Sequence, residues 1–280
     1  MKFTPISLTI AISSICIVAL PSATATTPTQ PELRQINLIG LYEEASLTPV
    51  QKNGKWGYVN TANRQVTKFI YDEADSFYEG MAKVRVGNKY GFVNIAGKQI
   101  VPAKYDEAYY FDNGIAQVKL NNKFGFINRA GKVIIPLKYD EAETFRDKDQ
   151  KIALVKFQGK YGFIDRTGKE AIPIKFTSAS TFYDQDLTWV SIDNKYGYID
   201  KTGKQVIALQ FDEDQSFFEG TARIKIGEKW GYIDKNGKQF IRPQYEEVED
   251  FRFGLAIVKL DGKSVYIDKN AKVIWNGDGK

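Results

Sequence analysis

The side chains that could do chemistry in this chain are carboxylates and amines. The 280 residues contain 34 Asp and Glu and 39 Lys and Arg, but no His. Without His, the chain lacks the usual general base and the commonest metal ligand. Its one Cys, Cys16, lies inside an N-terminal apolar run, so the rest of the chain has no thiol nucleophile, disulfide or Cys/His metal site. Any chemistry must therefore come from acids, lysines and aromatic rings.

These side chains belong to a motif that occurs seven times. It first appears as Gly-Lys-Trp-Gly-Tyr-Val-Asn at residues 54–60. We number each repeat from the third residue of the motif, the anchor, as position zero. Successive anchors are 34, 34, 37, 35, 34 and 34 residues apart, and a fixed period of this size indicates a repeat architecture. The anchors are Trp56, Tyr90, Phe124, Tyr161, Tyr196 and Trp230, with Ser264 in the last, degenerate repeat.

Acidic residues recur at position +16, where they could bind a cation or a glycan. A turn cap, or an ion pair with the Lys at position −1, is the simpler interpretation. A glycosidase needs one unique acid–base pair, whereas these acids recur along the chain. No phosphate loop or catalytic motif is present. The sequence therefore predicts no catalytic residue, no cofactor, no metal site and no enzyme activity. The acids are Asp72, Asp106, Asp140, Asp212 and Glu246, and Thr177 stands at this position in the fourth repeat.

The second repeat illustrates the expected local structure. Apolar and basic residues alternate over residues 82–86, which is typical of a half-buried strand, and Gly87-Asn88 is a hairpin turn signal. The anchor strand follows, with room beside its Gly for a neighbouring ring, and residues 94–97 form the next turn. Pro102 places a short third strand at a sheet edge.

Each repeat of about 34 residues is thus expected to be a three-stranded antiparallel meander, too small to bury its own core. We predict an all-β protein in which these meanders stack as an open twisted array, with the anchor aromatics in the core. A closed propeller-like ring is the alternative.

The recurring aromatic-Gly motif, with Lys before it and Asn or Asp after it, resembles the WG-repeat family, also called KWG repeats. The resemblance covers residues 47–280, as six clear repeats and a degenerate seventh in which Ser264-Val265 replaces aromatic-Gly. It implies a tandem β-repeat protein, often bacterial and often exported. The family brings no established catalytic residues.

The first 25 residues are typical of a secretory signal peptide. Lys2 precedes an apolar run from Ile6 to Leu20, and Ala23-Thr24-Ala25 is typical of a cleavage site. We expect cleavage near Ala25, secretion or a periplasmic location, and no stable membrane span afterwards; an uncleaved anchor is the alternative. Residues 26–46 are expected to be a linker and a short capping helix over 32–46.

A non-enzymatic binding scaffold at the cell envelope is the function predicted from these features. Without Lys2 the chain has 38 basic and 34 acidic residues, a net charge of +4 that does not indicate nucleic-acid binding. We expect a protein partner; a glycan or cell-envelope polymer, bound through exposed aromatics and Lys, is the alternative. A row of exposed rings would favour a glycan, and isolated apolar patches would favour a protein.

Two repeats depart from the period, and both carry their insertion between the Phe at +21 and the next strand. Insertions in repeat arrays map to one face, which is often the binding face. We therefore predict that these loops and one neighbouring Trp border the binding surface: Arg146, Asp147, Lys148, Asp149, Tyr183, Asp184, Asp186 and Trp189. The alternatives are that the loops have drifted in an unconstrained connection and that Trp189 lies in the core.

Overall fold

The computed structural model describes residues 47–145, 151–182 and 186–275. The predicted signal peptide and the predicted helix over 32–46 lie outside these residues, so both stay predictions. The described residues include no helix that is long and apolar enough to cross a membrane.

Every regular element in the described part of the chain is a β-strand, as predicted. The strands are β1 (Thr48–Lys52), β2 (Lys55–Val59), β3 (Glu73–Ala74), β4 (Met81–Val86), β5 (Lys89–Asn94), β6 (Gln99–Tyr105), β7 (Glu107–Ala108), β8 (Ile115–Leu120), β9 (Lys123–Asn128), β10 (Val133–Tyr139), β11 (Glu141–Ala142), β12 (Ile152–Phe157), β13 (Lys160–Asp165), β14 (Glu170–Phe176), β15 (Ser178–Ala179), β16 (Leu187–Ile192), β17 (Lys195–Asp200), β18 (Gln205–Phe211), β19 (Glu213–Asp214), β20 (Thr221–Ile226), β21 (Lys229–Asp234), β22 (Gln239–Tyr245), β23 (Glu247–Val248), β24 (Leu255–Leu260), β25 (Lys263–Asp268) and β26 (Val273–Trp275).

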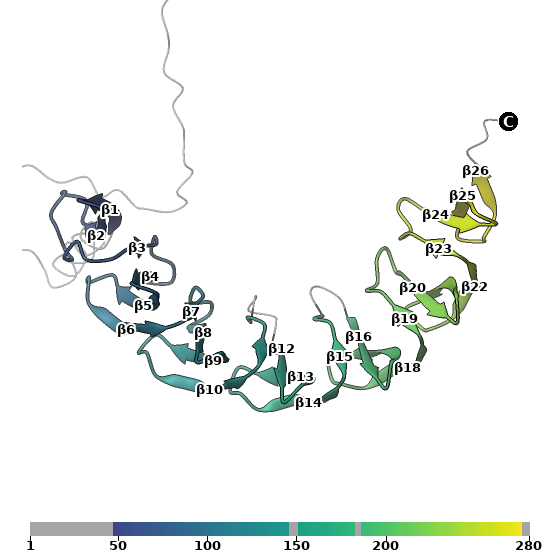
Figure 1. The fold of residues 1–280 in the computed structure, drawn as a ribbon, viewed down its shortest axis with the longest axis horizontal. Coiled ribbons are helices and arrows are strands. Elements are labelled where there is room, and N and C mark those ends of the chain that lie inside the picture. The colour runs from purple at the N-terminus through teal and green to yellow at the C-terminus, as the bar shows by residue number, and fades with distance from the viewer. Residues whose placement is uncertain (1–46, 146–150, 183–185, 276–280) are drawn as a thin grey trace, which may run out of the picture. The chain divides into compact units, whose positions relative to one another are not determined.

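The strands form seven antiparallel sheets that follow one another along the chain (Figure 1). Sheet 1 pairs β1 with β2, and sheets 2 to 7 have four strands each, in an order such as β3-β4-β5-β6. All strands that pair within the described residues are neighbours in sequence. In the described part of the chain no strand therefore joins a sheet other than its own, and no ring is closed through a shared strand, in agreement with the prediction of stacked meanders.

The predicted three-stranded meander is present in each complete sheet, but a short fourth strand adds to it. In sheet 2 this strand is Glu73–Ala74, where Glu73 lies opposite Arg85 of β4 and accepts a hydrogen bond from its guanidinium at 2.7 Å. Equivalent acid–base pairs join β7 to β8, β11 to β12, β19 to β20 and β23 to β24. Two residues are too few to show the alternation by which strands are predicted.

In sheets 2 to 6 the last strand, which is the third strand of the predicted meander, comes close to the anchor strand. β6 lies at the edge of its sheet, which confirms the expectation from Pro102, and its register against β5 shifts at a bulge. A Cβ at Gly91 would lie 2.4 Å from the carbonyl oxygen of Val101. The Gly after the anchor is therefore needed because backbone crosses it; the expected neighbouring ring is not what occupies this space.

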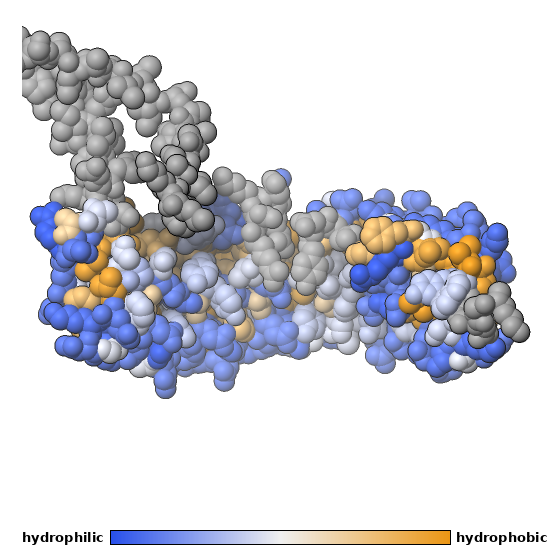
Figure 2. Space-filling view, turned by 90° about the horizontal axis from the view of Figure 1, so that it is seen from above, coloured by the Kyte–Doolittle hydropathy of each residue, from blue (hydrophilic) through white to orange (hydrophobic). Residues whose placement is uncertain are grey.

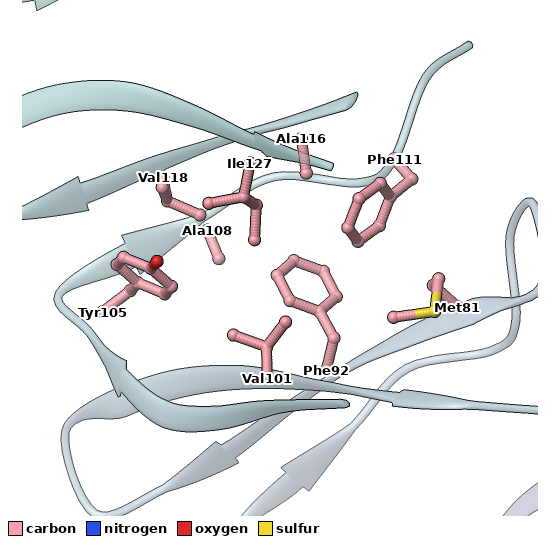
Figure 3. Packing of buried hydrophobic residues seen from close by; sticks show 9 residues of the cluster. All are labelled: Met81, Phe92, Val101, Tyr105, Ala108, Phe111, Ala116, Val118 and Ile127. Atoms are coloured by element: carbon pink, nitrogen blue, oxygen red, sulfur yellow. The ribbon is translucent and has the colours of Figure 1, made fainter. Parts of the chain in front are cut away.

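The apolar cores lie between successive sheets. The core in Figure 3 combines Phe92 and Val101 of sheet 2 with Val118 and Ile127 of sheet 3. Phe92, at position +2, faces Phe111, at position +21, with ring centres 4.9 Å apart. The equivalent pair recurs at the other five junctions, with ring centres 4.7–5.2 Å apart. One sequence repeat thus contributes aromatics to both sides of one junction.

The anchors themselves do not fill these cores, contrary to expectation. All six aromatic anchors are half-buried, whereas the residue at +2 in the same repeats is fully buried. The anchor is the second residue after a hairpin turn, near the N-terminal end of its strand. The anchor rings pack against the margins of the cores, and basic side chains lie over several of them: Lys119 Nζ lies 4.9 Å from the ring centre of Phe124, and Lys156 Nζ lies 4.9 Å from that of Tyr161.

The predicted turn after the anchor strand is confirmed in all seven repeats. Asn94 Oδ1 accepts hydrogen bonds from the backbone N–H groups of Ala96 and Lys98, at 3.1 and 2.9 Å. Gly131, at the equivalent of Gly97, has φ of +76°, and a Cβ there would lie 3.0 Å from Val101 of the preceding sheet. This Gly therefore serves both the turn and the packing of one sheet on the next.

The acids at +16 cap turns and pair with the Lys at −1, as the simpler interpretation predicted. Asp106 Oδ1 accepts a hydrogen bond from Lys89, and its Oδ2 accepts one from the backbone N–H of Asn121 at 2.7 Å. The same two contacts recur at Asp72, Asp140 and Asp212. Lys89, followed by the Asn121 N–H, lowers the pKa of the Asp106 carboxyl. Each acid thus links two successive sheets.

We predict that Phe126→Ala destabilises the protein more than Phe124→Ala. Phe126 is 1% exposed, so its truncation should lower the free energy of unfolding by about 3–5 kcal/mol. Half-buried Phe124 loses less apolar contact, and its truncation should cost about 1–2 kcal/mol. Urea unfolding followed by circular dichroism measures both. Equal losses would contradict the placement of the core at +2.

Acid should weaken the array through the carboxylates at +16. Their pKa values are lowered in the folded state, so their contribution to stability is present above the unfolded value of about 3.9 and is lost as pH falls through the lowered folded values. We expect the melting temperature to fall below about pH 4, and to fall less steeply in Asp106→Asn. Exposed Asp186 supplies the control variant, Asp186→Asn. An unchanged pH slope in Asp106→Asn would argue against the linkage.

Candidate functional site

The loop that joins the first two strands of each complete sheet is the place where the sequence predicted a binding surface. We call it the edge loop. Its range in sheets 2 to 7 is 75–80, 109–114, 143–151, 180–186, 215–220 and 249–254. Most of the predicted surface residues lie outside the described residues: Arg146, Asp147, Lys148, Asp149, Tyr183 and Asp184.

Two of the predicted residues are described. Asp186 is exposed at the end of its edge loop. Trp189 is half-buried on β16, with its ring centre 5.6 Å from that of Tyr196. It packs against the core between sheets 5 and 6. Sheet 5 also lacks the acid–base pair that joins the first two strands of the other complete sheets, because Ser178 lies opposite Ser191. Trp189 therefore supports the sheet beside the loop, and its ring is not freely presented to solvent.

Exposed aromatic rings gather on the edge loops. Six Phe, Tyr and Trp side chains in the described part of the chain are well exposed, and five of them stand in this loop. Buried aromatics are accounted for by packing, but exposed ones are not. Figure 2 shows hydrophobic surface between hydrophilic borders. The five are Tyr78, Tyr109, Tyr110, Phe218 and Phe253.

Three of these rings surround a cavity of about 800 Å³, which we call the tyrosine cavity. Tyr78 comes from the edge loop of sheet 2, and Tyr109 and Tyr110 come from that of sheet 3; Asp75, Asp112 and Thr144 add polar groups to the lining. The volume is within the range of small-ligand pockets and of pockets that receive a partner's side chain. The cavity therefore combines aromatic surface with carboxylates and hydroxyl groups.

A lysine orders one side of the tyrosine cavity. Lys83 Nζ lies 5.0 Å from the ring centre of Tyr110 and 3.3 Å from Asp75 Oδ2. The rings of Tyr78 and Tyr110 meet edge to face, with centres 6.4 Å apart. These contacts restrict the exposed rings, and restricted side chains lose less entropy when a ligand binds.

The edge loops are also tied to one another. Glu79 of sheet 2 accepts hydrogen bonds from the backbone N–H groups of Asn113 and Gly114 in sheet 3, at 2.9 and 3.0 Å, and pairs with Arg129 at 2.7 Å. Burial would raise the pKa of Glu79, but the Gly114 N–H, Arg129 and the Asn113 N–H outweigh burial and lower it. The carboxylate thus holds the neighbouring turn in place.

The aspartates at position +16 have a structural use. The four aspartates at +16 are engaged by a lysine and a backbone N–H, as described above. No group of three or more His, Cys, Asp and Glu side chains within the described ranges could hold a metal ion.

The sequence interpretation missed the tyrosines of the cavity. It relied on insertions to find the binding loops, whereas Tyr109-Tyr110 is a substitution without a length change. The other five clear repeats carry polar pairs at +19 and +20, such as Asp75-Ser76 and Glu249-Asp250. Comparison of the repeats at these two positions would have found the pair, because core packing requires only the Phe at +21.

Comparisons with known proteins support the repeat assignment. The model of the WG containing repeat matches at residues 56–90, 90–124, 124–161, 161–196, 196–230 and 230–263. A search of curated proteins found no match.

Similar solved structures include three of low sequence identity. A eukaryotic initiation factor is 11% identical, with 81% of this chain and 72% of that chain covered and a TM-score of 0.39. Hsv2 from Kluyveromyces lactis is 8% identical, with coverage of 81% and 88% and a TM-score of 0.34. BamB from Moraxella catarrhalis is 10% identical, with coverage of 82% and 81% and a TM-score of 0.32.

The six matches of the family model span residues 56–263 without a gap, with each match ending where the next begins, apart from the last at Lys263. These boundaries fall on the aromatic anchors that define the period of the array. The chain belongs to the family of proteins built from WG-containing repeats.

Proposed function

We propose that this protein is an exported, non-enzymatic scaffold that binds a protein partner at the cell envelope through its edge loops. The observation that carries the proposal is the gathering of exposed aromatics on this one loop of the repeat. Tyr, Trp and Arg dominate the binding energy of protein interfaces, usually in well-packed pockets. The tyrosine cavity offers such a pocket, and its exposed tyrosines stand beside the core Phe at +21 without being part of the core.

The distribution of the exposed rings favours a protein over a glycan. Among the described residues the rings form two groups, Tyr78 with Tyr109 and Tyr110 in the first loops, and Phe218 with Phe253 in the last; Tyr183 lies outside the described residues. Separate apolar patches suit a folded partner that contacts several loops, whereas a polymer bound along the array would use a ring in each repeat. We include in the proposed surface the insertions that the sequence places at 146–149 and 183–186, of which only Asp186 is among the described residues.

A glycan is the second candidate because the tyrosine cavity has polar groups among its rings. Asp75, Ser76, Asp112 and Thr144 could accept or donate hydrogen bonds to sugar hydroxyls. A glycan array probed with the unaltered protein and with the Tyr110→Ala variant separates the two candidates.

We predict that Tyr110→Ala weakens partner binding without unfolding the protein. Tyr110 is 55% exposed, so its loss should change the melting temperature little. As an interface anchor its loss should weaken binding by about 2 kcal/mol, or roughly thirtyfold. Recovery of the partner from envelope extract, followed by titration of the identified partner, measures the effect. Val206→Ala, which truncates an exposed residue of β18, is the matched control. Equal affinity of Tyr110→Ala and Val206→Ala would sink the assignment of the cavity.

Export is tested separately. The Ala23-Thr24-Ala25 sequence should be cleaved, so that the exported chain begins at or near Thr26. N-terminal sequencing of protein from the periplasmic or secreted fraction measures this. Recovery of the protein with Met1 still attached would contradict the predicted cleavage.

A further inference from the structure

The edge loop of sheet 7 ends in a hairpin tip that folding alone does not explain. Phe253 at this tip is 97% exposed, the highest value among the large apolar side chains described. A ring with almost no protein contact contributes no packing energy. Folding therefore does not account for Phe253, and we look for its role in binding.

The backbone of the tip makes a phenylalanine still less expected. Arg252 and Leu255 exchange backbone hydrogen bonds at 2.8 and 3.1 Å, which leaves Phe253-Gly254 as a two-residue turn. Both turn residues have positive φ, +53° and +82°. Such turns favour Asn-Gly, and a bulky residue in the left-handed region is strained.

The other edge loops show what the turn requires. Position +23 has a φ between +46° and +50° at Glu79, Asn113 and Glu219, each followed by a Gly. Asn or Glu thus forms the same turn with a polar side chain. Phe253 is the departure, and a local departure without a structural gain indicates a functional position.

The tip is held rigidly despite its exposure. The Glu219 carboxylate of the preceding edge loop accepts the Phe253 N–H at 3.1 and 3.3 Å. Phe218 in that preceding loop is also exposed, and the Arg252 guanidinium lies 5.5 Å from its ring centre. Two phenylalanines and an exposed arginine therefore stand together on two neighbouring loops.

Two basic residues of this region are exposed. They are Arg252 and Lys269, with Lys269 Nζ 5.9 Å from the ring centre of buried Phe251. Acids are present as well: Glu219 accepts the Phe253 N–H, Asp250 pairs with Arg223 at 2.8 Å, and Glu249 is exposed. Exposed aromatics with adjacent cations are the composition of peripheral segments that lie in an anionic lipid surface.

We propose that the Phe253 tip docks this protein on an anionic lipid surface, with Phe253 inserted at the level of the headgroups and Arg252 at the lipid phosphates. A lipid surface accepts a protruding ring without a matching pocket. An anchor in a protein interface is instead surrounded by contacts that exclude water, and a ring that is 97% exposed has few neighbours to form that border. This inference assigns Phe253 to a lipid surface and removes it from the protein-binding surface proposed above, which then rests on the tyrosine cavity. Its test does not depend on the partner of that cavity.

The central test compares the full chain with Phe253→Asn. Asn suits the turn, so the variant should melt about 2 °C higher, which excludes misfolding as the cause of any loss. Partition into vesicles of phosphatidylethanolamine mixed with phosphatidylglycerol should fall about tenfold. Arg252→Gln should lower partition about fivefold into these vesicles and leave partition into phosphatidylcholine vesicles unchanged. Equal partition of Phe253→Asn and the full chain would overturn the proposal.

A second measurement reports on the tip alone, because the apolar residues 6–20 would contribute to partition in every variant. The added indole emission of Phe253→Trp should shift to the blue with the anionic vesicles. Asn113→Trp, at the same turn position in sheet 3, is the matched control and should show no shift. An unshifted emission at 253, or an equal shift at 113, overturns lipid docking by this tip.

Discussion

The packing of each sheet against the next is the interaction on which the rest of this structure depends. A sheet of this size has too little apolar surface to form a core by itself, so the six cores lie between sheets. At every junction an aromatic at +2 meets an aromatic at +21, and small or branched side chains of the next sheet, such as Ala116 and Val118, pack against them. Because all junctions use the same positions, a residue inserted between +2 and +21 would misalign the pair. The two insertions in the chain accordingly follow +21.

This constraint separates the residues that the fold fixes from those that it leaves free. The Asp at +16, the Gly at +7 and the Glu at +23 all link one sheet to the next, at Asp106, Gly131 and Glu79 for example. The side chains at +19, +20 and +22 face no such requirement. The array can therefore carry Tyr109-Tyr110 or Phe218 in its loops without loss of packing, and function in such proteins is expected on loops held by a rigid scaffold.

Much of the fold was predictable because it rests on local signals repeated at a fixed period. The alternation of Ala82, Val84 and Val86, the Asn94 turn and the edge position enforced by Pro102 each predicted what the structure contains. The sequence analysis placed the anchor in the core, whereas the structure buries the residue at +2. In an alternating strand the anchor and the residue at +2 lie on the same face. Only the position of the next sheet decides which of the two is covered, and that is not a local property. The same limit explains the role of Gly91, which depends on a bulge in a different strand.

The sequence predicted which loop carries the candidate site, but not which residues form it. Insertions identify a loop that tolerates change, but they do not show which side chains the loop leaves in solvent. Tyr109 and Phe253 change the chemistry of the edge without changing its length, so a search for insertions passes over them. Phe253 also needs the backbone: only its φ of +53°, shared with Glu79, Asn113 and Glu219, shows that a polar residue would serve the turn better. When every structural requirement of a position is met by its equivalents in other repeats, the residue that departs from them is the one to explain by what it binds.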